Sequence, residues 1–252
     1  MLIDSHAHLQ WPDFDKDRGA VVSRARRAGV KQIINVGYDL EGSEDAVVLA
    51  EKYGLYASVG IHPHEAESFS DESLERLKEL CENPKVIGVG EVGLDYYRSP
   101  SSRVAQLNAF LTQIELAKEL DKPVIIHDRA AHGDILAALK RNEGEVRGVM
   151  HCFSGSFEMA KQCVKLGFFI SFAGPVTFPN ARRLHKLAKE LPLDYILIET
   201  DSPWLAPQSR RGKRNEPAFI VEVANKIAEL RKESLGRIAE ETSSNARKLF
   251  EI

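Results

Sequence analysis

The chain has 252 residues, of which 43% are hydrophobic and 28% charged, and its formal net charge at pH 7 is −3. This composition is ordinary for a soluble globular protein. The small negative charge excludes a whole-molecule electrostatic attraction to nucleic acid or to an anionic membrane. A polyanionic partner would have to be held by a local basic patch or by metal ions.

Cysteine usage and the apolar segments bear on the compartment. The three cysteines, Cys81, Cys152 and Cys163, form no paired spacing, which favours a reducing environment over a disulfide scaffold. Asp4 stands where a secretory signal would need apolar residues, and the apolar segment 168–178 is too short to cross a bilayer. These features predict a cytoplasmic enzyme with no membrane partner, and no obligate protein partner is evident.

Short β-rich runs alternate along the chain with longer stretches of helical periodicity. We expect strands at residues 2–4, 32–36, 56–60, 86–91, 124–127, 148–151, 168–172 and 196–199. We expect helices at residues 18–28, 43–53, 71–81, 103–120, 134–140, 157–166, 181–191 and 217–231, with one more at 234–250. The helix at 103–120 is the clearest, and we expect its buried stripe to be Val104, Leu107, Leu111, Ile114 and Leu120.

No linker or low-complexity tract interrupts this alternation, so we expect one domain over residues 1–252. Several strands are apolar throughout, as in a parallel sheet that is covered on both faces. Eight β-α repeats in this length predict an α/β fold of the TIM (β/α)8 barrel type. A doubly wound open sheet is the competing fold, but no glycine-rich phosphate fingerprint follows the first strand.

The side chains able to bind metal share one position in this pattern. Each lies at or just after the carboxyl end of a predicted strand: His6, His8, Glu91, His127, His151 and Asp201. A barrel gathers these strand ends at one face, where the active sites of such enzymes lie. Buried imidazoles and carboxylates are costly without partners, so their joint placement predicts a metal site.

These features resemble the TatD family of metal-dependent deoxyribonucleases, within the amidohydrolase-like barrel superfamily. The resemblance covers nearly the whole chain and depends on the order and spacing of short motifs. The motifs are DSHAH at 4–8, GIHPH at 60–64, GVGEVGLD at 88–95, PVIIH at 123–127, GVMHCFSG at 148–155, ETDSPWL at 199–205, RGKRNEP at 211–217 and SNA at 244–246.

The resemblance implies two divalent metal ions, magnesium, manganese or zinc. One ion would be bound by His6, His8, Glu91 and Asp201, and the other by Glu91, His127 and His151, with Glu91 as the bridge. Glu91 and Asp201 would be the catalytic residues, Asp201 accepting a proton from water. Asp128 departs from the family, which usually has a small hydroxyl residue there, and it either alters metal preference or faces outward.

Two further features concern the substrate. The resemblance suggests His64 as a donor to phosphate, whereas His62 is equally well explained as structural. A basic loop follows Asp201 and contains the candidate substrate-binding residues Arg211, Lys213 and Arg214, which favour a phosphorylated or polyanionic substrate. Three aromatic residues at the same face are able either to stack on bases or to pack: Tyr96, Tyr97 and Trp204.

The leading hypothesis is a hydrolase that cleaves phosphodiester bonds with a metal-bound hydroxide. By resemblance it would be a 3′-5′ exonuclease acting on DNA or another phosphorylated substrate. An amidohydrolase or an aminoacyl-tRNA ester hydrolase would use the same two ions. A metal-binding factor without catalysis would be expected to lack a ligand, and none of the six is missing. Cys152 beside His151 is better explained as a small packing residue than as a nucleophile.

Overall fold

The computed structural model describes residues 1–252 and contains one sheet of eight parallel strands, ordered β1 to β8. The strands are β1 (Leu2–Ala7), β2 (Val30–Val36), β3 (Tyr56–Val59), β4 (Val86–Asp95), β5 (Val124–Arg129), β6 (Gly148–Met150), β7 (Phe169–Phe172) and β8 (Ile196–Ile198). Ala7 forms a parallel bridge with Ser202, just after β8, so the sheet closes on itself. The predicted TIM barrel is therefore confirmed.

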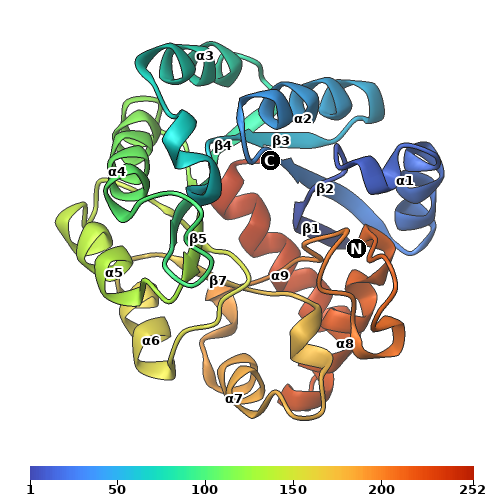
Figure 1. Cartoon of the computed structure of the whole chain (residues 1–252). Coiled ribbons are helices and arrows are strands. Elements are labelled where there is room, and N and C mark those ends of the chain that lie inside the picture. The colour runs from blue at the N-terminus through green and yellow to red at the C-terminus, as the bar shows by residue number, and fades with distance from the viewer.

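A ring of helices surrounds the strands (Figure 1). The helices are α1 (Arg18–Arg27), α2 (Leu40–Tyr53), α3 (Asp71–Cys81), α4 (Arg103–Glu119), α5 (His132–Arg141), α6 (Phe157–Lys165), α7 (Arg182–Glu190), α8 (Ile220–Arg231) and α9 (Leu235–Phe250). Each overlaps a predicted helix. All of them are too short or too polar to cross a membrane.

The interior of the barrel has its own small core, separate from the larger layer between strands and helices. Side chains from seven of the strands, such as Ile3, Ile87 and Leu197, pack there with residues of α9 that include Leu249 and Phe250. In Figure 1 α9 crosses the middle of the ring. These inner residues precede the candidate ligands along their strands, so α9 fills one end of the barrel and leaves the carboxyl end for the site.

Helix α4 buries a different face from the one that its periodicity predicts. Val104 is 80% exposed and Leu107 is 36% exposed, so the predicted stripe is wrong at both positions. The helix instead buries Gln106 and Gln113, whose amides hydrogen-bond to the backbone of Asp95 and Ile61 respectively. Satisfying these backbone groups outweighs the burial of two aliphatic side chains. Helix α4 thus supports two segments that border the site.

Close packing at two glycines brings Glu91 to the site. A Cβ atom on Gly60, just after β3, would lie 2.9 Å from the Cα atom of Gly90 in β4. A Cβ atom on Gly90 would lie 2.7 Å from Ile125 in β5. A larger residue at either position would push neighbouring strands apart and displace Glu91, which follows Gly90 directly.

Candidate metal centre

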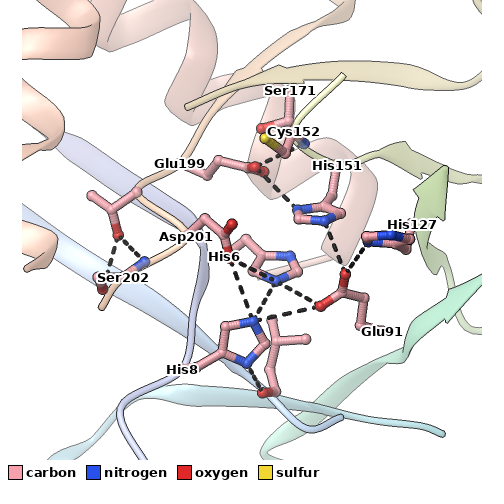
Figure 2. A network of polar contacts seen from close by, with 12 residues as sticks. His6, His8, Glu91, His127, His151, Cys152, Ser171, Glu199, Asp201 and Ser202 are labelled. Carbon is pink, nitrogen blue, oxygen red and sulfur yellow. Dashed lines mark hydrogen bonds and ion pairs between the residues drawn. The ribbon is translucent and has the colours of Figure 1, made fainter. Parts of the chain in front are cut away.

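The six predicted ligands lie together toward the carboxyl-end face of the barrel (Figure 2), although β4 continues four residues beyond Glu91, where the sequence predicted its end. His6 belongs to β1, Glu91 to β4 and His127 to β5, and the other three residues directly follow a strand or lie within three residues of its end. Glu91 stands between two groups of imidazoles. The structure therefore brings together side chains that are up to 195 positions apart in the chain (201 − 6).

One carboxylate oxygen of Glu91 faces the histidines of β5 and β6. Its Oε1 atom lies 2.8 Å from Nδ1 of His127 and 2.9 Å from Nε2 of His151. The other oxygen, Oε2, lies 3.3 Å from Nε2 of His6 and 3.5 Å from Nε2 of His8. A single carboxylate therefore spans two groups of nitrogen atoms.

Asp201 completes the group around β1. Its Oδ1 atom lies 3.5 Å from Nε2 of His8 and 3.8 Å from Nε2 of His6, and those two nitrogens are 2.9 Å apart. The backbone amide of Asp201 donates to the carbonyl oxygen of His6, which fixes the end of β8 against β1. Atoms of His6, His8 and Asp201 lie close enough together to hold a metal ion, as do those of His62, Glu91 and His127.

The outer nitrogen of three candidate ligands is held by an acceptor. Nδ1 of His8 donates to the carbonyl oxygen of Val36 (2.7 Å), and Nδ1 of His151 faces Oε1 of Glu199 (3.1 Å). Nε2 of His127 faces Oδ2 of Asp95 (3.4 Å). A proton held on the outer nitrogen leaves the lone pair of the inner nitrogen free, which is the usual arrangement around metal-bound histidine. The donor set fits a divalent cation.

Burial and neighbouring charges shift the pKa values of the candidate ligands in different directions. Burial lowers the pKa of His6 to about 3, so this ring is neutral and its lone pair is available. Burial also disfavours charge on His8, but the carboxylates of Asp201 and Glu91 outweigh it and raise the pKa of His8 to about 9. Burial acts to raise the pKa of Glu91, yet the surrounding histidines hold it well below its usual range. The central carboxylate is thus ionised and needs positive charge around it.

The two histidines after β3 play different parts. Nδ1 of His62 accepts from the backbone amide of His64, so its proton lies on Nε2, which points at Oε1 of Glu91 from 3.5 Å. Burial lowers the pKa of His62 to about 4, which keeps it neutral. Nε2 of His64 is bound to Oδ2 of Asp95 at 2.8 Å. His62 therefore presents an N–H group to the site, whereas His64 has only Nδ1 free.

Two buried acids that sequence reasoning did not single out hold the ligands in place. Asp95 accepts hydrogen bonds from two backbone amides and contacts His64 and His127. Glu199 accepts from the amide of Cys152 as well as contacting His151. Both acids lie at strand ends inside the quoted motifs, so a carboxylate at a strand end was a signal that pointed to them.

Asp128 and Cys152 directly follow the candidate ligands His127 and His151, but neither has the features of a ligand or a nucleophile. The carboxylate of Asp128 accepts from the amide of Ala131 and pairs with His132 at 2.7 Å, so both of its oxygens are used by the loop that leads into α5. Burial, together with the nearby acid Glu199, raises the pKa of the Cys152 thiol well above its usual value. A thiol that stays protonated is a poor nucleophile.

The basic loop after β8 is partly used for structure. Arg214 makes a two-pronged ion pair with Asp17, at 2.7 and 2.8 Å, and is thereby tied to the start of α1. Arg211 is exposed and its guanidinium lies 5.0 Å from the centre of the Phe178 ring. Lys213 is exposed and has no ion-pair partner within 4.0 Å. Two of the three predicted substrate-binding residues are therefore free of ion pairs.

A barrel that gathers these imidazoles and carboxylates at one face has the features of a metal-dependent hydrolase. The family model described as TatD related DNase matches residues 3–251, and the chain belongs to this family. The resemblance expected from the motifs is thus confirmed.

Individual relatives agree with this assignment. The chain is 44% identical to the metal-dependent hydrolase YabD of Bacillus subtilis (strain 168), with all of both chains covered. It is 36% identical to the 3′-5′ ssDNA/RNA exonuclease TatD of Erwinia tasmaniensis, again with all of both chains covered. The crystal structure of YjjV, a TatD homologue from Escherichia coli K12, superposes with a TM-score of 0.93 at 37% identity, covering 100% of this chain and 98% of that one.

Proposed function

We propose that this hydrolase is a phosphodiesterase with two metal ions, acting as a deoxyribonuclease from the 3′ end of DNA. The observation that carries the proposal is the position of Glu91, whose two carboxylate oxygens face two separate groups of histidines. The name of the Erwinia relative, an exonuclease of single-stranded DNA and RNA, supports a nucleic-acid substrate.

His6, His8, Glu91 and Asp201 would hold one divalent ion, and Glu91, His127 and His151 the other. Zinc and manganese suit a mixture of imidazole and carboxylate ligands, and magnesium is an option where oxygen ligands dominate. When bound, two such ions activate water and neutralise negative charge on a phosphate.

Asp201 is our candidate for the proton acceptor. Its side chain is 14% exposed, so it borders both the ligands and the open mouth of the barrel. A carboxylate next to a water molecule that a metal ion activates can accept the proton of that water. Glu91 contributes by holding the two groups of ligands at a fixed separation, since it contacts both.

The residues that we propose for phosphate binding come from two sides of the site. The basic loop residues Arg211, Lys213 and Arg214 keep their predicted roles, with the ion pair to Asp17 limiting what Arg214 can do. His64 would reach a phosphate only through Nδ1, because its Nε2 atom is bound to Asp95. The N–H group of His62 faces Oε1 of Glu91 at 3.5 Å, so it is a further donor at the same place. The three cysteines remain free thiols, which supports our placing the enzyme in a reducing compartment such as the cytoplasm.

The test uses the purified protein reloaded separately with magnesium, manganese and zinc. Single- and double-stranded DNA, an aminoacyl-tRNA ester and a cyclic amide would be offered to each form. We expect turnover of DNA, and Asp201→Asn should abolish it while leaving the protein folded, as circular dichroism would show. Turnover of the ester or the amide without any DNA cleavage would favour the alternative hydrolases. Retained activity in Asp201→Asn would remove this residue from the mechanism.

A further inference from the structure

Two aromatic side chains of the whole chain are exposed, and both lie at the metal-centre face. Tyr97 is 70% exposed and follows β4, whereas Trp204 is 41% exposed and follows β8. Every other aromatic residue is buried or half-buried. Both exposed rings therefore lie at the face where a ligand of the metal centre would meet them.

Trp204 is held rigidly beside two of the candidate metal ligands. Its backbone amide donates to the carbonyl oxygen of Asp201 at 3.0 Å, so a tight turn separates the ring from that carboxylate. The indole lies edge-to-face against His8, with ring centres 5.2 Å apart. Buried Asn215 braces this turn by bonding to the carbonyl oxygens of Thr200 and Pro203. The ring is therefore fixed before any ligand arrives.

A second aromatic layer supports the indole from behind. Trp11, which packs on the hydrophobic core, lies 4.9 Å from the ring centre of Trp204 and 5.0 Å from that of Tyr38. The contact between the two tryptophans is edge-to-face rather than stacked. Tyr97, in contrast, has the guanidinium of Arg129 4.6 Å from its ring centre. Of the two exposed rings, Trp204 is the one anchored beside the metal ligands.

We propose that Trp204 is a stacking platform for the unpaired nucleobase next to the phosphate that is cleaved. This inference rests on the proposed function, because the phosphate at the metal centre places the adjoining nucleoside within reach of a ring that contacts His8. An aromatic ring stacks on any base without reading its sequence. Bases inside a duplex are already stacked and paired, so the platform favours single strands or frayed ends.

The first test is binding, which does not require turnover. Thymidine 5′-monophosphate and 2-deoxyribose 5-phosphate would each be titrated calorimetrically into the metal-loaded protein. Stacking of one base predicts that the nucleotide binds about 5- to 150-fold more tightly than the sugar phosphate. Trp204→Leu keeps an apolar side chain against Trp11 and should remove this preference, whereas Trp204→Phe should retain most of it.

Tyr97→Ala is the matched control, since it removes the other exposed aromatic ring from the same face. It should leave the nucleotide preference within about twofold of the unsubstituted protein, a free-energy difference smaller than RT. Equal affinity for the two ligands in the unsubstituted protein, or weak binding of both, would overturn the proposal. So would a preference that survives in Trp204→Leu or disappears in Tyr97→Ala.

The second test is cleavage of single-stranded oligonucleotides whose terminal or penultimate nucleotide lacks its base. Removing the base at one of these positions should lower kcat/KM of the unsubstituted protein by about 5- to 150-fold. Trp204→Leu should cleave base-containing and base-free ends equally. If Trp204→Leu instead loses the same factor of kcat/KM on base-containing and base-free oligonucleotides, the stacking role of Trp204 is refuted. A protein that binds the nucleotide through Trp204 but cleaves no DNA would refute the proposed nuclease function alone.

Discussion

The carboxylate of Asp95 lies 3.4 Å from the Nε2 atom of His127, on the side of the ring away from Glu91. When a metal ion binds to Nδ1, this contact would hold the ring proton on Nε2 and leave the lone pair of Nδ1 to the ion. Because the same carboxylate accepts from His64 and from the amides of Tyr97 and Arg98, it is itself rigidly placed. Asp95 thus sets which nitrogen of His127 is available to a metal.

Asp95→Asn should weaken metal binding at His127 without unfolding the protein. The amide keeps one oxygen for the backbone donors, but its NH2 group donates to Nε2 and drives the ring proton onto Nδ1. Loss of such a supporting contact typically costs about 10- to 100-fold in metal affinity. Calorimetric titration of each protein with the metal would measure this loss of affinity. Asp128→Asn is the control, since its carboxylate pairs with His132, and equal losses in both variants would contradict this role of Asp95.

Removing metal should destabilise the fold as well as stop hydrolysis. A ligand present at about 100 times its Kd adds about 2.7 kcal/mol to the free energy of unfolding. For a chain of this size, stripping it with a chelator should lower Tm by about 5–10 °C. Differential scanning calorimetry before chelation, after it and after reloading would record the change. An unchanged Tm together with lost activity would argue against ions held by residues from several strands.

Replacing Arg211 and Lys213 together by alanine should weaken binding of single-stranded DNA and flatten its salt dependence. Each lost phosphate contact should reduce the slope of log K against log salt by about 0.7. Fluorescence anisotropy at several salt concentrations would give the slope. The control pair is Arg27→Ala with Lys31→Ala. Arg27 ends α1 and Lys31 is the second residue of β2, at the opposite end of the barrel. Equal slopes for both double variants would make the loop ordinary solvated surface.

Asp17→Asn should lower the free energy of unfolding by about 1 kcal/mol, since the ion pairs with Arg214 and Arg24 are partly exposed. Hydrogen bonding to these guanidiniums holds the pKa of Asp17 well below its usual range. A carboxyl group whose pKa is lowered by folding stabilises the protein at pH values above its unfolded-state pKa of about 4. It loses that contribution as the pH falls below this value. The free energies of unfolding of the unsubstituted protein and of Asp17→Asn should therefore differ by the full amount at pH 7. This difference should shrink below about pH 4. Urea unfolding at each pH would test this, with Asp13→Asn as a neighbouring control that has no ion pair.

The alternation of strands and helices, and with it the barrel, could be read from the amino-acid order. His6, His127 and His151 stand at or near the carboxyl ends of their strands, and Glu91 lies in the carboxyl half of β4, so a closed parallel barrel brings all four toward one face. The hydrophobic periodicity of each segment and the place of a histidine or acid within it are local properties of the chain. The sequence could therefore predict the fold class and the residues of the candidate site.

What the sequence could not decide depended on contacts between distant segments. Helix α4 exposes Val104 because Gln106 is needed at the backbone of Asp95, and no periodicity reveals such a partner. His62 and His64 look alike in the chain, yet only His62 presents an N–H group to Glu91, since Asp95 takes that of His64. Hydrogen bonds that choose a ring nitrogen, and aromatic rings that meet across strands, exist only once the barrel has closed.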